Sequence, residues 1–211
     1  MNLINYLKEI YGYDNPIFVK DIRIGGRSKT AIREELSRAY KKGLIERERS
    51  GIYFFKSEKR FGSGIDFNQI LQKKFIYADK VPDDLKELYV EGYYSGMTFL
   101  NQVGISEQVP AIFEITTNKT SSKKRYFTSN GFIAIIRKAR IEVNFQNYKY
   151  LQFLDMFHFI SLDEVKENKR LICDYAKKIG FGKIAFTNYI KFYGPKTMKK
   201  IVEGGILNEL V

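Results

Sequence analysis

Residues 23–55 of the chain read RIGGRSKTAIREELSRAYKKGLIERERSGIYFF, a basic stretch that predicts a helix followed at once by a short hairpin. Two adjacent glycines interrupt the chain, and Ser28 then offers a side-chain oxygen that can accept a hydrogen bond from an orphan N–H of the first helical turn. At the other end, Gly43 suits the left-handed conformation that closes a helix, and Leu44 is expected to fold back onto the last turn. These signals predict a helix that ends at about Lys42.

The two faces of this predicted helix differ in polarity. Apolar side chains recur at spacings of three and four residues, which places them together against the rest of the module; they are Ile32, Leu36, Ala39 and Tyr40. The opposite face and its flanks are polar and mostly cationic, with Lys29, Thr30, Arg33, Glu34, Ser37, Arg38 and Lys41. These polar side chains are free to meet the groove of a nucleic acid, and Ser28 at the start of the helix is expected to contact the DNA with them.

A hairpin is expected directly after the helix. Residues 44–47 and 52–55 are strand-like runs, and residues 49–51 lie between them, where the chain must turn. Arginines near a hairpin tip can reach phosphates or the minor groove while the helix occupies the major groove, and phosphate contacts supply most of the non-specific affinity for DNA. Arg47 and Arg49 are placed for this role.

The beginning of the chain completes the module. A helical stripe of apolar residues occupies the N-terminus, and Pro16 opens a second short apolar segment, residues 17–22, which is expected to supply another helix; the stripe consists of Leu3, Ile4, Leu7 and Ile10. Three helices and a hairpin within residues 1–60 predict a winged helix-turn-helix domain that binds DNA. Two alternatives remain open: a solvated surface helix, and a winged helix that contacts protein.

Composition supports an acidic partner. The chain has 211 residues and a formal net charge of +12, enough length for two small domains. Residues 1–60 hold 14 basic and eight acidic side chains, a net charge of +6, and residues 61–211 hold 22 basic and 16 acidic ones, also +6. Because the first segment is less than half as long, its charge density is more than twice as high, which locates the expected nucleic-acid footprint there.

Several classes of protein are disfavoured. The single cysteine, Cys173, excludes an intramolecular disulfide, and no Cys/His cluster is present to hold zinc. The N-terminal MNLINYLKEIYGYDN lacks the apolar core and cleavage site of a secretory signal, and no stretch is apolar for eighteen residues. We therefore expect a cytoplasmic protein that is not inserted in a membrane.

A second domain is expected over residues 61–211, after a polar linker at 57–63 and a boundary near Phe61. Expected helices lie at 65–77 and 84–103, and Gly92 and Gly96 would weaken or kink the latter. Strand-forming runs occupy 111–117, 124–128 and 132–136, with 141–145 as a possible fourth, and the polar run 118–123 has the composition of a hairpin loop. Further helices are expected at 150–160, 162–179, 186–192 and 195–202. The predicted fold class is α+β, with a small, mainly antiparallel sheet and several helices.

One segment carries a family resemblance. The sequence GYYSGMTFLN at 92–101, followed by Gly104, the run QVP at 108–110 and the strand ending TTNK at 116–119, resembles the AbiEi-type antitoxins of the abortive-infection (type IV) AbiE toxin–antitoxin systems. The likeness covers this segment and the winged-helix region, about half of the chain. In residue terms, the glycines permit close packing, and the segment reads more as a fold signature than as a ligand site. Tyr93, Tyr94 and Asn101 are the members that could bind something.

The resemblance implies a transcriptional regulator in phage defence. In such a protein the N-terminal winged helix represses its own operon at inverted repeats, which requires two bound copies, and the C-terminal domain is required for antitoxin activity. The cognate toxin would be a nucleotidyltransferase that is counteracted without a stable toxin–antitoxin complex. Some relatives occur without a toxin, so a stand-alone regulator is the alternative. The sequence leaves the oligomeric state and the operator sequence open.

Catalytic groups are scarce. The sole histidine, His158, lies in the apolar run FLDMFHFI, and no nucleophile motif surrounds it. A DNA-acting nuclease is the rival hypothesis because Glu114 and Lys119 lie on and just after a predicted strand, but a lysine sharing the glutamate's face would occupy the position of Thr116. The run GFGK at 180–183 lacks the remaining residues of a phosphate loop. We expect no enzymatic activity and no catalytic, cofactor-binding or metal-binding residues.

Overall fold

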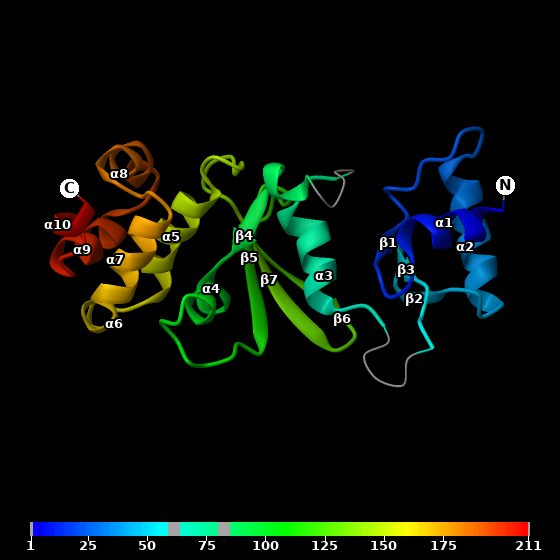
Figure 1. The fold of residues 1–211 in the computed structure, drawn as a ribbon, viewed down its shortest axis with the longest axis horizontal. Coiled ribbons are helices and arrows are strands. Elements are labelled where there is room, and N and C mark those ends of the chain that lie inside the picture. Colours follow the sequence, from blue (N-terminus) through cyan, green and yellow to red (C-terminus); the bar gives the residue numbers. More distant parts are fainter. Residues whose placement is uncertain (1, 59–63, 80–84, 211) are drawn as a thin grey trace. The chain divides into compact units, whose positions relative to one another are not determined.

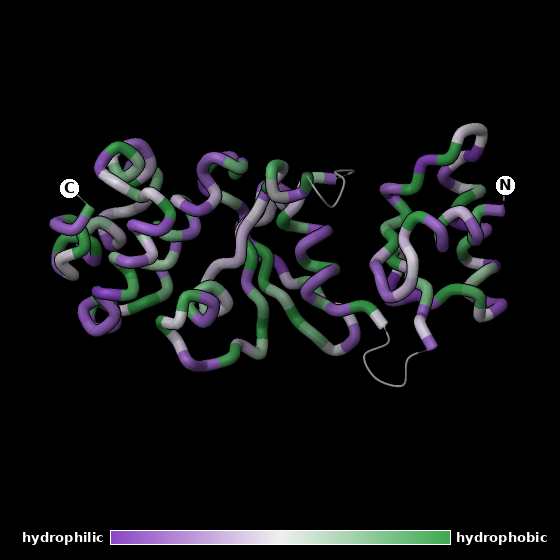
Figure 2. The backbone as a smooth tube through the Cα atoms, in the orientation of Figure 1, coloured by the Kyte–Doolittle hydropathy of each residue, from purple (hydrophilic) through white to green (hydrophobic). Residues whose placement is uncertain are grey.

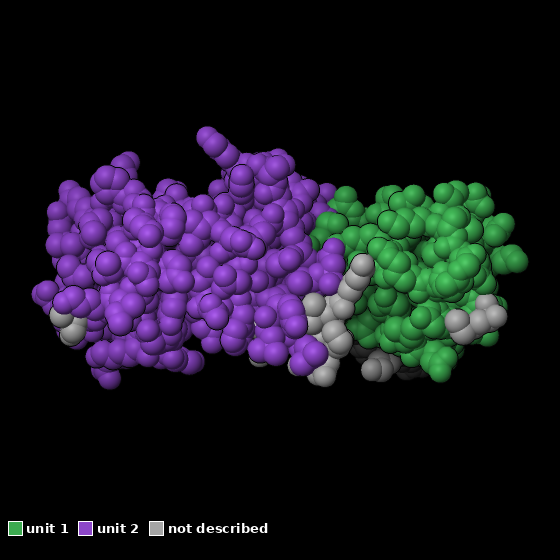
Figure 3. Space-filling view, turned by 90° about the horizontal axis from the view of Figure 1, so that it is seen from above, with its two compact units in different colours: residues 1–74, 129–132 green, residues 75–128, 133–211 purple. Residues whose placement is uncertain are grey.

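The protein has a mixed α+β fold. The computed structural model describes residues 2–58, 64–79 and 85–210. Their packing separates two compact units, coloured separately in Figure 3: the first extends to Lys74 and includes Ser129–Phe132, and the second comprises Phe75–Thr128 and the residues from Ile133 onward. The predicted boundary near Phe61 lies outside the described residues. Within the described residues, no helix has both the length and the apolar character needed to cross a lipid bilayer.

The first unit combines helices with a three-stranded antiparallel sheet (Figure 1). Its elements are α1 (Leu3–Tyr11), β1 (Ile17–Phe18), α2 (Lys29–Lys41), β2 (Glu46–Arg49), β3 (Ile52–Phe54) and α3 (Phe67–Leu71). The strand order is β1-β3-β2, so β3 lies between the two others. A turn of π-helix, Gln72–Ile76, continues α3, and together they occupy the helix expected at 65–77.

The core of the first unit follows much of the predicted apolar pattern. The predicted core residues that are buried are Leu3, Leu7, Ile32, Leu36 and Ala39, and Ile4 packs against them. Ile10 and Tyr40, which were expected on the same stripes, are 55% and 42% exposed. The spacing of apolar residues shows which face of a helix is apolar, but it does not show how much of that face other elements cover. The prediction was therefore wrong for these two residues.

The helix expected at residues 17–22 is absent. Ile17 and Phe18 instead pair with Tyr53 and Ile52 of β3, and the N–H of Val19 donates to the carbonyl of Gly51 at 3.0 Å. A run of β-branched and aromatic residues suits an extended backbone that can be buried on both faces, and pairing with β3 supplies its hydrogen bonds. Residues 2–58 therefore contain two α-helices rather than the three expected.

The second unit joins a four-stranded sheet to a group of helices. Its strands are β4 (Gly92–Tyr94), β5 (Ile112–Thr117), β6 (Lys124–Ser129) and β7 (Phe132–Lys138), in the order β4-β5-β7-β6. Its helices are η2 (Lys86–Leu88), α4 (Gly96–Gln102), α5 (Tyr148–Phe159), α6 (Leu162–Glu167), α7 (Lys169–Lys178), α8 (Lys183–Tyr189), η3 (Ile190–Phe192), α9 (Pro195–Glu203) and α10 (Leu207–Leu210). α4 packs on β5, α5 packs on β4, and α8 and α9 pack on α5.

The strand connections of this sheet differ from the expected hairpin. β5 pairs antiparallel with β4 but parallel with β7, so the six-residue run 118–123 carries the chain past β7 to the edge position of β6. The tight turn lies instead between β6 and β7, where Asn130 and Gly131 have φ values of 46° and 78°. An Asn-Gly pair between two strands is the stronger hairpin signal, because both residues tolerate positive φ. Apolar residues fill β7, which reads FIAIIRK and is largely green in Figure 2.

The prediction of one long helix at residues 84–103 was also wrong. Residues 92–94 form strand β4, and the chain then turns at Gly96, whose φ of 56° begins the short helix α4. A Cβ on Gly92 would lie 2.4 Å from the carbonyl oxygen of Phe75, so this glycine lets two backbones meet. The two glycines therefore mark a strand, a turn and a helix rather than a kinked helix. Residues 141–145 form no strand.

Candidate nucleic-acid interface

Helix α2 is held at both ends by the residues that predicted it. Ser28 is its N-cap, and the hydroxyl oxygen of Ser28 accepts from the N–H of Ala31 at 3.1 Å. Gly43 has a φ of 69°, and its N–H donates to the carbonyl of Tyr40 at 3.0 Å. The next residue, Leu44, donates its N–H to Ala39, which completes a Schellman motif. The expected apolar contact of Leu44 is absent, because its side chain is 56% exposed.

The outer face of α2 presents the predicted residues to solvent. The exposed members are Lys29, Thr30, Arg33, Arg38 and Lys41, while Ser37 is half-buried. Among the described residues, none of the four cations of this set is in an ion pair, so their charges are not neutralised within the protein. The hydroxyl oxygen of exposed Ser28 caps the helix, and its O–H group can still donate a hydrogen bond to a phosphate.

An ion pair with Arg27 compensates the negative charge of Glu35, an acidic residue of α2. The Arg27 guanidinium contacts the carboxylate of Glu35, and the two side chains are 29% and 30% exposed. Arg27 stands just before the N-cap, so the pair also ties the preceding loop to the helix. Exposed Glu34 is the acidic member left on the predicted outer face. The face therefore keeps a net positive charge.

The first strand of the hairpin after α2 lies two residues later in the chain than expected: β2 begins at Glu46 rather than at residue 44. β2 extends to Arg49, two residues beyond the predicted strand end, and the turn falls at Ser50 and Gly51, whose φ is 82°. Arg47 pairs with Tyr53 but Arg49 pairs with Ile52, so Glu48 is the extra residue of a β-bulge. A bulge changes the direction in which the following side chains point. The alternation of residue types in the sequence does not show where such a bulge occurs.

Contacts of the hairpin side chains differ from one another. The Arg47 guanidinium lies 5.9 Å from the centroid of the Tyr53 ring, a cation–π distance. The carboxylate of Glu48 accepts hydrogen bonds from Ser129 at 2.7 Å and from Asn130 at 2.5 Å, both within the first unit. Glu48 is thereby hydrogen-bonded away from the turn, whereas Arg47 and Arg49 on either side of it are exposed.

A basic hollow of about 600 Å³ connects the helix to the hairpin. Arg33 and Ser37 of α2 and Arg47 of β2, three of the predicted site residues, line it together with Lys20 and Lys74. None of the described residues that line the hollow is acidic. Several cations around one concave surface create a positive potential that attracts phosphate. The remaining predicted residues lie outside this lining; they are Ser28, Lys29, Thr30, Arg38, Lys41 and Arg49.

Sequence reasoning missed Lys20 and Lys74. Lys20 follows β1, and Lys74 lies in the π-helical turn, where its ammonium group is 5.6 Å from the centroid of the Phe18 ring. Neither position shares a local pattern with α2, since the two lysines reach the hollow only through the tertiary fold. Pairing of β1 with β3 was the missing step, because it brings Phe18 and its neighbours beside the hairpin.

The residues of the nuclease hypothesis have separate structural partners in the second unit. Glu114 pairs with Arg137 at 2.7 Å, whereas Lys119 pairs with Asp79 at 2.9 Å and Glu91 at 3.3 Å. No group of three or more His, Cys, Asp or Glu side chains suited to a metal ion occurs among the described residues. Glu114 and Lys119 therefore take part in separate ion pairs and do not contact each other in these pairs.

No protein-family model matches the chain, and no curated protein matches it.

Proposed function

We propose that this protein is a DNA-binding transcriptional repressor whose first unit acts as a winged helix. The observation that carries the proposal is the exposed cationic face of α2, which shares a basic hollow with the β2–β3 hairpin. An α-helix with its side chains is about 10–12 Å across, and the major groove is about 12 Å wide, so the groove can admit α2.

In this proposal the helix and the hairpin have different tasks. Arg33 and Ser37 lie one turn apart on α2 and would face base edges in the major groove, where arginine recognises guanine through two hydrogen bonds. Arg47 and Arg49 would contact the adjacent backbone or the minor groove, and Lys29, Thr30, Arg38 and Lys41 would contact flanking phosphates. An inverted-repeat operator would hold two copies of the protein.

The resemblance of residues 92–119 to AbiEi-type antitoxins extends the proposal. The protein would act in the cytoplasm as autorepressor and antitoxin of an AbiE-like phage-defence system, opposing a nucleotidyltransferase toxin without forming a stable complex with it. A stand-alone regulator without a toxin would keep the same DNA-binding surface. The product of the adjacent gene separates the two roles: an antitoxin should restore growth when coexpressed with a nucleotidyltransferase toxin encoded there, whereas a stand-alone regulator has no such neighbour.

Competition between DNA duplexes tests the central part of the proposal. The full chain is bound to a labelled fragment from upstream of its own gene at about 0.15 M salt, and unlabelled fragment or a scrambled duplex of equal length is added. Specific proteins prefer their own site by a factor of roughly 10³ or more. Equal competition by both duplexes would refute a repressor that reads sequence, and the absence of any binding would refute the DNA interface itself.

A further inference from the structure

A second concave site lies wholly within the second unit. It has a volume of about 340 Å³ and lies between the backbone segments around residues 76–77 and 90–94 on one side and the first turns of α5 on the other. Its polar and aromatic lining includes Tyr77, Tyr94, Tyr148, Lys149 and Gln152. Small-molecule sites fall between about 300 and 1,000 Å³, so the volume suits one small ligand.

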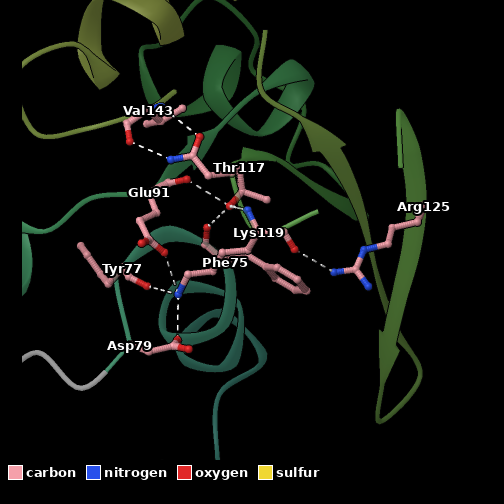
Figure 4. A network of polar contacts seen from close by, with 9 residues as sticks. Phe75, Tyr77, Asp79, Glu91, Thr117, Lys119, Arg125 and Val143 are labelled. Atoms are coloured by element: carbon pink, nitrogen blue, oxygen red, sulfur yellow. Dashed lines mark hydrogen bonds and ion pairs between the residues drawn. The ribbon is translucent and has the colours of Figure 1, made fainter. Parts of the chain in front are cut away.

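Side-chain hydrogen bonds join the two backbone segments, around residues 76–77 and 90–94, that form one wall of the pocket. The Thr117 hydroxyl lies 2.6 Å from the carbonyl oxygen of Phe75 and 3.1 Å from that of Glu91. Figure 4 shows the ammonium group of Lys119 among Tyr77, Asp79 and Glu91, where it hydrogen-bonds the Tyr77 carbonyl and forms ion pairs with both carboxylates. These bonds hold the two segments together before any ligand binds, which lowers the entropic cost of binding.

Tyr93 and Gly92 form a fixed part of the same wall. The Tyr93 hydroxyl donates to the buried Asp155 at 2.8 Å, so the ring of Tyr93 cannot rotate out of its position. Gly92 lets this segment lie against the backbone of Phe75, since a Cβ there would lie 2.4 Å from the Phe75 carbonyl oxygen. The segment that carries the family resemblance therefore supplies both packing contacts and pocket surface.

The wall formed by α5 carries the groups suited to recognition. Gln152 is buried, with 9% of the residue exposed. Its amide donates to the Tyr94 carbonyl at 2.8 Å and accepts from the Tyr175 hydroxyl at 3.4 Å, which leaves one N–H and one lone pair of the amide. Lys149 is exposed, has no ion pair among the described residues, and lies 5.7 Å from the centroid of the Tyr148 ring. Lys149 is the one charged side chain among the described residues that line the pocket.

We propose that this pocket binds a nucleoside phosphate. The half-buried rings of Tyr77, Tyr94 and Tyr148 line the pocket. The Lys86 ammonium group lies 5.5 Å from the centroid of the Tyr77 ring and the Phe113 ring lies 6.4 Å from that of Tyr94, so we assign the stacking of a planar base to Tyr148. A base edge can use the remaining hydrogen-bonding groups of Gln152. The phosphate would meet Lys149 at the first turn of α5, where the helix dipole also favours negative charge. Aromatic faces, an amide and an uncompensated cation in one preformed pocket suit a ligand that is planar at one end and anionic at the other.

Calorimetric titration of the full chain, without DNA, tests the proposal. The probes are ATP, GTP, CTP and UTP, with adenosine and tripolyphosphate as the two halves of the ligand. At least one nucleotide is expected to bind about tenfold or more tightly than either half. Tripolyphosphate binding as tightly as every nucleotide would overturn the role of Tyr148, and the absence of saturation by any nucleotide at millimolar concentration would overturn the site.

Matched variants place the binding in this pocket. Tyr148→Ala and Lys149→Gln should each weaken nucleotide binding about tenfold, whereas Tyr148→Phe should retain it, because stacking needs the ring and not the hydroxyl. The controls are Tyr126→Ala and Lys124→Gln on the edge strand β6, where a similar pair lies 5.2 Å apart and Tyr126 is 62% exposed. Equal losses in the control pair would overturn the assignment. If Tyr148→Ala fails to fold, an unchanged affinity of exposed Lys149→Gln still overturns it.

Discussion

Replacing Arg47 by alanine is expected to remove one phosphate contact from the hairpin. Arg47 lines the basic hollow and stacks on Tyr53, which holds its guanidinium beside α2. Each phosphate contact changes the slope of log K against log salt by about 0.9 for duplex DNA. We take the affinities with and without this contact as equal at about 1 M salt. At about 0.15 M salt the contact then raises log K by about 0.7, which is roughly fivefold in affinity or about 1 kcal/mol.

Fluorescence anisotropy with operator and scrambled duplexes between about 0.05 and 0.3 M salt measures this slope. The variant should bind both duplexes about fivefold more weakly at about 0.15 M salt, with a slope shallower by about 0.9. Arg170→Ala is the control, since this arginine of α7 is 96% exposed and 3.9 Å from Asp174. An unchanged slope for Arg47→Ala, or an equal change for Arg170→Ala, would refute the reasoning.

Three further predictions concern recognition and stability. Arg33→Ala should weaken operator binding by about 1–3 kcal/mol and scrambled binding much less, and an equal loss on both duplexes in the same anisotropy assay would remove its role in base recognition. Gly43→Ala should destabilise the fold by about 1–2 kcal/mol in urea denaturation because its φ is 69°, whereas Gly25→Ala, with open space and no positive φ, should change little. Hydrogen bonds from Ser161 hold the pKa of Glu164 below its ordinary value, so this capping box stabilises the protein above about pH 4.5 and is lost as the pH falls through the lowered pKa. Glu164→Gln should remove this pH-dependent contribution, and an unchanged pH profile of unfolding would contradict it.

Local sequence signals were sufficient for the helix at the centre of the proposed interface. The cap at Ser28, the left-handed Gly43 and the buried Ile32, Leu36 and Ala39 all depend on neighbours within a few turns, and such interactions leave a readable pattern. The exposure of the predicted cations follows from the same periodicity. Tyr40 and Leu44 were misjudged because their environment depends on where other elements end.

Strand pairings between segments far apart in the chain could not be predicted from local sequence signals. The strand β1 depends on a partner at residues 52–53, and the parallel pairing of β5 with β7 depends on the order in which three strands assemble. The bulge at Glu48 shifts the register of the hairpin without a glycine to mark it. The hollow and the second-unit pocket are both formed by such long-range pairings, so their complete linings were not visible in the sequence.

The segment 92–119, which carries the family resemblance, contains residues that hold the fold together and residues that line the second-unit pocket. Thr116, Thr117 and Lys119 each fix a different element through side-chain hydrogen bonds, as expected of a fold signature. Tyr94 lies in the same motif but lines the second-unit pocket, whereas the amide of Asn101 donates to the carbonyl of Ser106. Of the motif residues that could bind a ligand, Tyr93 and Tyr94 are the two that line this pocket.

Chemical-shift mapping of the backbone amides during titration with the upstream duplex shows which residues meet DNA. The amides of residues 29–41 and 46–51 should shift most, together with those of Lys20 and Lys74, while the strands of the second unit should change little. Perturbations confined to the second unit, or absent from α2 and the hairpin at saturating duplex, would contradict a DNA interface built on these elements.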